Sequence, residues 1–154
     1  LPQTREPELH PGMLLLDRIQ DPGNLGTILR TADAFDIPVV LTNGCADPFS
    51  EKTVRASMGA VFRTPPQSIE LEKLLKLCAE KNLPLAATAL SPTARDIREV
   101  ELSDKLAVIG SEGQGICAEL LAASQTQVII PMSPRCESLN AAVAAALVLW
   151  QMKR

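Results

Sequence analysis

Short apolar runs alternate with amphipathic stretches along most of the chain. Five such runs predict β-strands: Met13–Leu16, Pro38–Leu41, Leu85–Thr88, Leu106–Ile109 and Val128–Ile130. Apolar runs of this length, separated by helical patterns, are typical of βαβ units, whose strands pair in parallel. The sequence therefore predicts an α/β fold with a largely parallel sheet, in the single domain that a length of 154 residues suits.

Between the first two runs, apolar residues recur at the spacing of one helix face. This pattern predicts a helix over Asn24–Phe35 that packs on the sheet and turns Thr27 and Arg30 to the opposite face. The same spacing recurs over Ile69–Asn82, where a charged outer face and a following proline predict a helix with a structural role only.

The last segment, Ser138–Arg154, is rich in alanine and apolar around most of a helical circumference. A helix of this kind is buried, either in the core of its own chain or against a second subunit. The pattern leaves both arrangements open.

Charge and aromatic content argue against a surface dedicated to nucleic acid. Lys and Arg total 15 against 18 Asp and Glu, which gives a formal net charge of -3 and disfavours an autonomous polybasic binder. Aromatic residues make up 3% of the chain, too few for a broad base-stacking platform. The local exception runs from Lys52 to Ile69, where Lys52, Arg55 and Arg63 occur without a single acid.

The first eleven residues, Leu1–Pro11, are polar, punctuated by proline and unlike a signal peptide. We expect them to be a linker or tail that follows a further N-terminal domain, with the folded domain over residues 12–154. The most apolar stretch, Leu139–Trp150, is too short to span a bilayer. We therefore expect a soluble, cytoplasmic protein with no membrane partner.

The four cysteines, Cys45, Cys78, Cys117 and Cys136, stand far apart, and His10 is the only histidine. This spacing fits reduced thiols and predicts no metal site. For each cysteine, a small buried hydrophobe is the first interpretation. A single histidine also disfavours a Ser-His or Cys-His pair for nucleophilic hydrolysis.

Polar residues and glycines concentrate where predicted strands end, which is where ligands bind in open α/β sheets. The first cluster, Asp21–Gly26, leads into the Arg30 helix, and Asn24 is predicted as its N-cap. A capped helix start explains Asn24 as well as a function does. The second cluster, Arg55–Ala60, combines small residues that permit close approach with arginines that could bind phosphate, although an exposed basic helix fits equally well.

The third cluster, Gly110–Gly115, follows a predicted strand with glycines spaced G-x-x-G-x-G, unlike the dinucleotide fingerprint or the P-loop. Glu112 within this turn would repel a pyrophosphate but would tolerate a cation or a neutral adenosine-like ligand. The fourth cluster is Ile130–Met132 with Ser138–Asn140. Ser138 is predicted to cap the last helix, whereas Asn140 is an amide in an otherwise apolar first turn, where an unpaired polar group is costly.

In this order, the four clusters resemble the three motifs of the SpoU/TrmH family of RNA ribose 2′-O-methyltransferases in the SPOUT superfamily. The resemblance runs from about Leu14 onward, with motif one at Asp21–Ala32, motif two at Val54–Ala60, and motif three at Ile109–Gly115 together with the fourth cluster. It implies a Rossmann-like sheet whose C-terminal segments form a deep trefoil knot, an exception to the rule against knots. It also implies a homodimer formed partly by the C-terminal helix.

The resemblance implies S-adenosyl-L-methionine as the methyl donor, bound in the knot loops. The residues that it assigns to the donor pocket are Thr88, Ala89, Leu90, Gly110, Glu112, Gly113, Ile130, Met132, Ser138, Leu139 and Asn140.

The residues assigned to catalysis by the resemblance are Arg30, Asn24, Glu112, Ser138 and Asn140. Methyl transfer to a hydroxyl requires the two reacting centres to be held in line and the developing alkoxide to be stabilised. A guanidinium stays protonated, so Arg30 is expected to donate a hydrogen bond to the 2′-oxygen rather than to act as a base. Glu112 is the plausible carboxylate base nearby.

The expected substrate is structured RNA, with rRNA favoured over tRNA. Base methylation within the same superfamily and a non-catalytic RNA-binding module are the alternatives, and a nucleotide-dependent oxidoreductase is disfavoured by the glycine spacing. Because the net charge is negative, we expect RNA affinity to come from the further N-terminal domain, helped by Lys52, Arg55 and Arg63.

Overall fold

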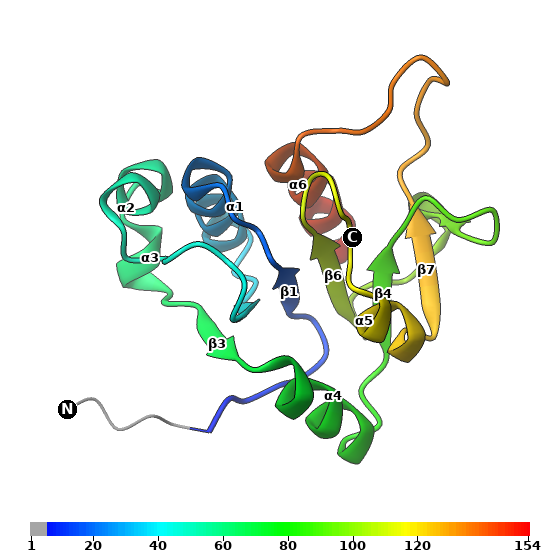
Figure 1. Cartoon of the computed structure of the whole chain (residues 1–154), viewed down its shortest axis with the longest axis horizontal. Helices are drawn as coiled ribbons and strands as arrows, with labels where there is room; N and C mark the ends of the chain where they lie inside the picture. Colours follow the sequence, from blue (N-terminus) through cyan, green and yellow to red (C-terminus); the bar gives the residue numbers. More distant parts are fainter. Residues whose placement is uncertain (1–5) are drawn as a thin grey trace.

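A seven-stranded sheet in which every strand pairs in parallel forms the centre of the molecule (Figure 1). The computed structural model describes residues 6–154. The strand order is β3-β2-β1-β6-β4-β7-β5. The strands are β1 (Leu14–Asp17), β2 (Val39–Thr42), β3 (Gln67–Ile69), β4 (Leu85–Thr88), β5 (Arg95–Asp96), β6 (Leu106–Gly110) and β7 (Thr126–Ile129). The predicted α/β class and largely parallel sheet are confirmed.

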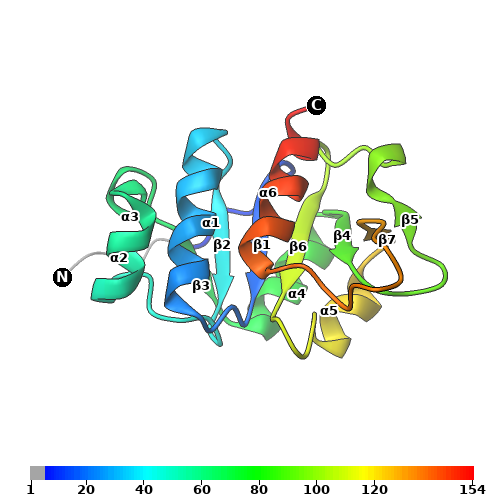
Figure 2. The ribbon, with the colours of Figure 1, turned by 90° about the horizontal axis from the view of Figure 1, so that it is seen from above.

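Helices cover both faces of this sheet, as Figure 2 shows from above. On one face α1 packs against α6, and α2 and α3 pack against α1; α4 and α5 lie on the other face. The helices are α1 (Pro22–Ala34), α2 (Glu51–Ser57), α3 (Ala60–Arg63), α4 (Leu71–Glu80), α5 (Ala118–Ala123) and α6 (Ala141–Met152), with one 3-10 turn, η1 (Ile97–Glu99).

The apolar runs of the sequence are the strands that helices cover on both faces. Leu14 and Leu16 of β1 point into the core beneath α1 and α6, whereas Met13 and Leu15 point into the core beneath α4 and α5. A strand that is buried on both faces has no polar face, so its sequence is a continuous apolar run instead of an alternating one. This is why the runs predicted these strands within one or two residues of their ends.

Two strands lie outside the prediction, and both are at the edges of the sheet. β3 contributes one fully buried residue, Ile69, and β5 consists only of Arg95 and Asp96. An edge strand is covered incompletely and therefore carries little of the apolar signal. The strand predicted at Val128–Ile130 is present but begins two residues earlier, at Thr126.

Both predicted helix caps are wrong by a few residues. Asp21, not Asn24, caps α1: its Oδ1 accepts hydrogen bonds from the backbone N–H groups of Gly23 (2.8 Å) and Asn24 (3.2 Å). Pro22 occupies the first helical position, where a missing N–H costs nothing, so the cap must precede it. The side chain of Asn24 is therefore free for contacts outside its own helix.

At α6 the cap is Asn140 and not Ser138. Its Oδ1 accepts hydrogen bonds from the N–H groups of Ala142 (2.8 Å) and Val143 (3.2 Å). The amide that looked out of place inside an apolar helix thus satisfies the helix's own unpaired donors.

Of the predicted linker Leu1–Pro11, residues 1–5 lie outside the described part of the chain. From Glu6 on, the segment packs against the domain: Leu9 is buried, and the N–H of Glu8 donates to the side-chain oxygen of Gln67 at 2.8 Å. That this segment joins a further domain stays a prediction.

The cysteines form no disulfide. Cys78 is buried, which raises the pKa of its thiol to about 11, and Cys45 and Cys117 are half-buried. Cys136 is exposed, so the interpretation as a small buried hydrophobe is wrong there, because the residue lies on a loop rather than in a packed element. Among residues 6–154, no three potential ligands gather at a metal site, and no helix has the length and apolar character needed to cross a bilayer.

A small residue of the second cluster, Ala56, permits a close approach between helices α1 and α2. A Cβ atom on Gly26 of α1 would lie 2.5 Å from the backbone oxygen of Thr53 and 2.6 Å from the Cβ of Ala56, both in α2. The contact requires glycine on one helix and a small residue on the other. It fixes α2 against α1, whose N-terminus enters the site described below.

We predict that Gly26→Ala lowers the free energy of unfolding by about 1–3 kcal/mol, because the helices must separate to admit the methyl group. Urea denaturation followed by circular dichroism measures the change. Gly113→Ala is the matched control, since its Cβ would meet no atom within 4 Å. Equal denaturation midpoints for Gly26→Ala and the native protein would show that the α1–α2 contact is less tight than described.

Candidate active site

Two cavities open at the carboxyl edge of the sheet, on either side of one loop. The smaller, about 320 Å³, lies between the loops that follow β1 and β6, and the larger, about 800 Å³, lies beyond β6 toward β4 and β7. Residues Ser111–Gln114 line both. Strands β1 and β6 are neighbours, with β2 and β3 on the far side of β1 and with β4, β7 and β5 on the far side of β6. The strand order therefore changes direction between β1 and β6, and open α/β sheets bind ligands at such a point.

The loop between the cavities folds back tightly on the end of β6. The N–H of Gly115 donates to the backbone oxygen of Ser111 at 2.9 Å, and Gly115 has a φ of 67°. A Cβ atom on Gly110 would lie 2.3 Å from the carbonyl carbon of Gly115, so only glycine fits at this position. The glycines of the third cluster thus form a reversed loop and not a phosphate cradle.

The larger cavity brings together the ends of β4, β6 and β7 and the segment before α6. Ten of the eleven residues predicted for the donor pocket line it: Thr88, Ala89, Leu90, Gly110, Glu112, Gly113, Ile130, Met132, Ser138 and Leu139. Asn140 does not line it, because its side chain caps α6 and reaches toward α1 instead.

The chemistry of this cavity suits an uncharged or cationic ligand. Its lining includes apolar side chains such as Leu90 and Leu139, and its ionisable members are the acids Glu112 and Glu137, with no Lys or Arg among the lining residues that the structure describes. A volume near 800 Å³ suits a ligand of nucleoside size. The absence of cations from these walls agrees with the argument from Glu112 against a pyrophosphate.

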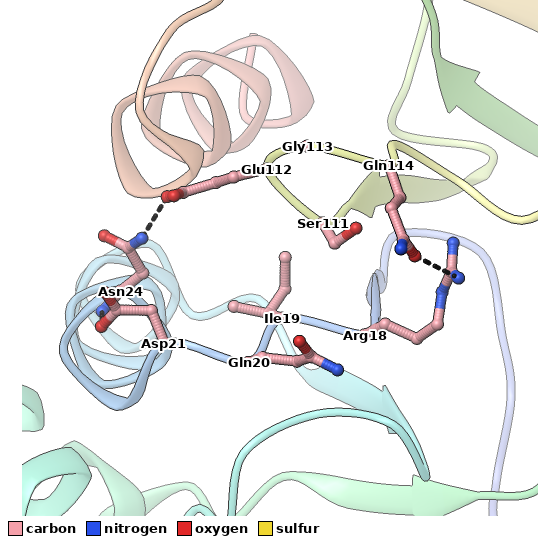
Figure 3. Close-up of a pocket in the computed structure, with 9 residues that line it drawn as sticks. All are labelled: Arg18, Ile19, Gln20, Asp21, Asn24, Ser111, Glu112, Gly113 and Gln114. Atoms are coloured by element: carbon pink, nitrogen blue, oxygen red, sulfur yellow. Dashed lines mark hydrogen bonds between the residues drawn. The ribbon is translucent and has the colours of Figure 1, made fainter.

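Three residues predicted to be catalytic meet between the two cavities. The amide nitrogen Nδ2 of Asn24 donates to Oε1 of Glu112, as Figure 3 shows, and Nδ2 of Asn140 donates to Oδ1 of Asn24 at 3.1 Å. The backbone N–H of Ala141 also points to Oε1 of Glu112, at 3.3 Å. The first turns of α1 and α6 therefore hold one carboxylate from the loop after β6.

The other two residues predicted to be catalytic lie outside this contact. Ser138 lines the larger cavity without joining the hydrogen bonds of Asn24, Glu112 and Asn140. Arg30 is exposed on α1, six residues after Asn24, which corresponds to about 9 Å along the helix axis. It lines neither cavity and forms no hydrogen bond with those three residues.

The smaller cavity contains residues that the sequence argument missed. Arg18 and Gln20 line it with Asp21 and Asn24, and the guanidinium of Arg18 reaches the loop after β6 (Figure 3). The available signal was the charged pair Asp17-Arg18 directly after the apolar run of β1, at the edge where ligands bind. Nothing in the spacing indicated what its side chain would contact.

The three basic residues predicted to bind RNA differ in their surroundings. Arg55 pairs with Glu51 at 2.5 Å, and Arg63 pairs with Asp33 at 2.7 Å, so acids from outside the Lys52–Ile69 stretch offset two of the charges. Lys52 is exposed and extends along the first turn of α1: its Cε would lie 3.9 Å from a Cβ on Gly23, the residue before Asn24. RNA binding by these residues stays a prediction.

Comparison with known proteins identifies the family of this chain. A sequence profile of the SpoU rRNA Methylase family matches residues 11–150. The chain is 38% identical over 143 residues to the 23S rRNA (guanosine(2553)-2′-O)-methyltransferase of Bacillus subtilis, a match that covers 92% of this chain and 57% of that protein. It is 35% identical over 156 residues to the tRNA (guanosine(18)-2′-O)-methyltransferase of Thermus thermophilus, covering 99% of this chain and 77% of that one.

A solved structure extends the comparison to the fold. The AdoMet-bound rRNA methyltransferase of Sinorhizobium meliloti superposes with a TM-score of 0.86 and 36% identity, over 94% of this chain and 58% of that one. The chain thus spans little more than half the length of the Bacillus and Sinorhizobium proteins. With a profile match that runs from the first buried strand to the last helix, this chain belongs to the SpoU rRNA methylase family.

Proposed function

We propose that this domain transfers a methyl group from S-adenosyl-L-methionine to a ribose 2′-hydroxyl of RNA. The observation that carries the proposal is the loop Ser111–Gln114, which forms a wall of both cavities. Group transfer needs two binding sites in direct contact, with the reacting atoms in line across their boundary. Relatives whose names specify 2′-O-methylation of guanosine support the choice of the ribose.

The larger cavity is the proposed donor site. When bound there, S-adenosyl-L-methionine supplies an electrophilic methyl group on a positively charged sulfur. Leu90, Ile130 and Leu139 offer apolar surface to an adenosine, and the backbone of Gly110–Gly115 offers polar groups at close range. Glu112 and Glu137 suit a cation, and the lining contains no basic side chain to oppose one. The bound donor in the Sinorhizobium relative supports this fit.

The smaller cavity is the proposed acceptor site. Glu112 is the one acidic residue, among those described, that lines both cavities, so it is the carboxylate placed to accept the proton that a 2′-hydroxyl loses. Asn24 and the N–H of Ala141 hold its Oε1 in position. Ser138, on the donor side, and Asn140, through Asn24, would then orient the two reactants.

Arg30 has an electrostatic role in this proposal. It follows Asn24 along the exposed side of α1, with Thr27 between them, so an RNA strand lying along α1 would contact all three. Its guanidinium would donate hydrogen bonds to the ribose or to an adjoining phosphate and stabilise the developing negative charge. Lys52, beside the first turn of α1, would add a further contact to the backbone of the RNA.

We further propose that the active form is a homodimer. Val143, Leu147 and Trp150 form one apolar stripe of α6 and are 50%, 43% and 67% exposed. Trp150 packs edge-on against Phe35, the C-cap residue of α1, with ring centroids 5.8 Å apart, so the stripe continues to the end of α1. The helix is therefore buried on one side in its own core and open on the other, which fits a second copy of the chain.

We also propose that the C-terminal segment is threaded as a trefoil knot. Two observations support this: β7 lies inside the sheet between β4 and β5, and the segment after it lines the same cavity as the loop Gly110–Gly115 before α6 begins. A crystallographic backbone trace tests the threading. The proposal fails if the traced chain straightens completely when its two ends are pulled apart.

The proposed reaction predicts a modified ribose and not a modified base. Protein is incubated with isotope-labelled S-adenosyl-L-methionine and with rRNA or tRNA from cells that lack the gene, and the digested nucleosides are analysed by mass spectrometry. We expect labelled 2′-O-methylnucleosides from rRNA. A label on a base would favour the alternative activity, and a label in tRNA alone would reverse the substrate preference.

In the same assay, Arg30→Ala is expected to slow methyl transfer by about 100-fold or more, the effect of removing a donor that stabilises developing charge. Its affinity for S-adenosylhomocysteine, measured by calorimetry, should stay within about twofold of the native value, because Arg30 lines neither cavity. Arg95→Ala, which removes another exposed arginine, is the matched control. Native turnover by Arg30→Ala would remove Arg30 from the mechanism.

For the dimer, sedimentation velocity should give the mass of two chains for the native protein and of one chain for Leu147→Glu, because the carboxylate would be buried in the interface without a partner. Phe62→Glu introduces the same charge at an exposed apolar residue outside the α6 stripe and should remain dimeric. A native protein that sediments as a monomer contradicts the proposal.

A further inference from the structure

Arg18 has a backbone conformation that its residue type does not favour. It follows β1 directly with a φ of 57°, in the left-handed region, where a side chain is disfavoured and glycine is at ease. Its stem lies against Gly44, where a Cβ atom would come within 2.6 Å of the Cγ of Arg18. Unfavourable backbone conformations of this kind persist where the surroundings impose them, and they concentrate at functional sites.

The guanidinium of Arg18 is bound to the loop that separates the two cavities. Nη1 donates to Oε1 of Gln114 and Nη2 to the backbone oxygen of Gly115, both at 3.1 Å (Figure 3 shows the first). The same carbonyl otherwise receives only a long contact from the hydroxyl of Ser111, at 3.4 Å. Arg18 thus supplies the shorter of the two side-chain contacts to this carbonyl, beside the backbone hydrogen bond from the N–H of Gly115 to Ser111.

The neighbouring residue, Asp17, holds the next part of the same segment. Its Oδ2 accepts a hydrogen bond from the N–H of Cys117 at 2.9 Å, and its Oδ1 accepts one from Oγ1 of Thr42 at 3.1 Å. Asp17 is buried and pairs in register with Gly110, where the loop begins. Asp17, at the end of β1, and Arg18, directly after it, therefore hold the chain on both sides of Ile116, a residue that lines the larger cavity.

We propose that Arg18 is a positioning residue for the donor site. It lines the smaller cavity and not the larger one, so it acts on the donor site through the loop, from the opposite side. By fixing Gln114 and Gly115, it keeps Ser111–Gly115 in the shape that forms one wall of the larger cavity before any ligand binds. This inference rests on the proposed function for the identity of the donor.

Arg18→Gly separates this role from a contribution to folding. Glycine accepts the left-handed backbone without strain, but the variant also loses the ion pair between Nε and Oδ2 of the buried Asp17, which are 3.4 Å apart and share no hydrogen bond. Because these two effects oppose each other, we expect the midpoint of urea denaturation to stay near the native value, while the dissociation constant for S-adenosylhomocysteine increases about tenfold. In the ligand-free protein, amide hydrogen exchange at Gly113 and Gly115 should accelerate.

Two further variants complete the experiment. Asp36→Gly relieves the same left-handed conformation (φ 56°) at a residue that lines neither cavity, and it should leave ligand affinity and loop exchange unchanged. Arg18→Lys keeps the charge but cannot bind two acceptors as a fork, so we expect an intermediate loss of affinity.

The outcomes distinguish this inference from the proposed function. If the native protein does not bind S-adenosylhomocysteine, the donor assignment fails, and the exchange measurement alone decides whether Arg18 holds the loop. If the native protein binds it and Arg18→Gly binds it equally well with unchanged exchange, the positioning role is wrong. A parallel fall in affinity and in denaturation midpoint would assign Arg18 to folding alone and would also overturn the proposal.

Discussion

The contact between Gly110 and Gly115 is the constraint on which the site depends. The chain reverses direction at the end of β6, and this brings the two backbones so close that no side chain fits between them. The reversed loop is one thin wall with a different cavity on each face. A wider turn would fill one of these cavities and separate the ligands that the proposed reaction brings together.

This loop places the carboxylate of Glu112 at the N-termini of two helices, α1 and α6. The first turns of α1 and α6 lie beside each other, and Asn24 and the N–H of Ala141 both donate to Glu112. The partial positive charge of each helix end favours an anion at that position. Asp21 and Asn140 accept hydrogen bonds from other N–H groups of these turns. The first turns of α1 and α6 therefore contain both the helix caps and the residues that hold Glu112. The close α1–α2 contact at Gly26 holds one of the two helices in place.

The sequence predicted the parts of the fold that have a continuous apolar signal. Strands β1, β2, β4 and β6 are buried on both faces and were located within a residue or two, whereas the edge strands β3 and β5 carry too little apolar character to be recognised. The caps were misassigned because several residues of each cluster can cap a helix. Only Pro22 at the first position of α1, and the hydrogen bonds that the side-chain oxygen of Asn140 accepts at α6, distinguish them.

Site residues were predicted where a motif resemblance covered them and missed elsewhere. The motifs named Asn24, Glu112 and Asn140, but their contacts join positions 88 and 116 residues apart, which no local period encodes. No motif covered Arg18, and its proposed positioning role rests on a backbone conformation and two hydrogen bonds that only the folded chain reveals. The net charge of -3 also conceals a local difference: Arg55 and Arg63 each pair with an acid, whereas Lys52 and Arg30 are exposed and form no ion pair among the described residues. The proposed contact with RNA therefore rests on the position of these two cations, along and beside α1, rather than on the net charge of the domain.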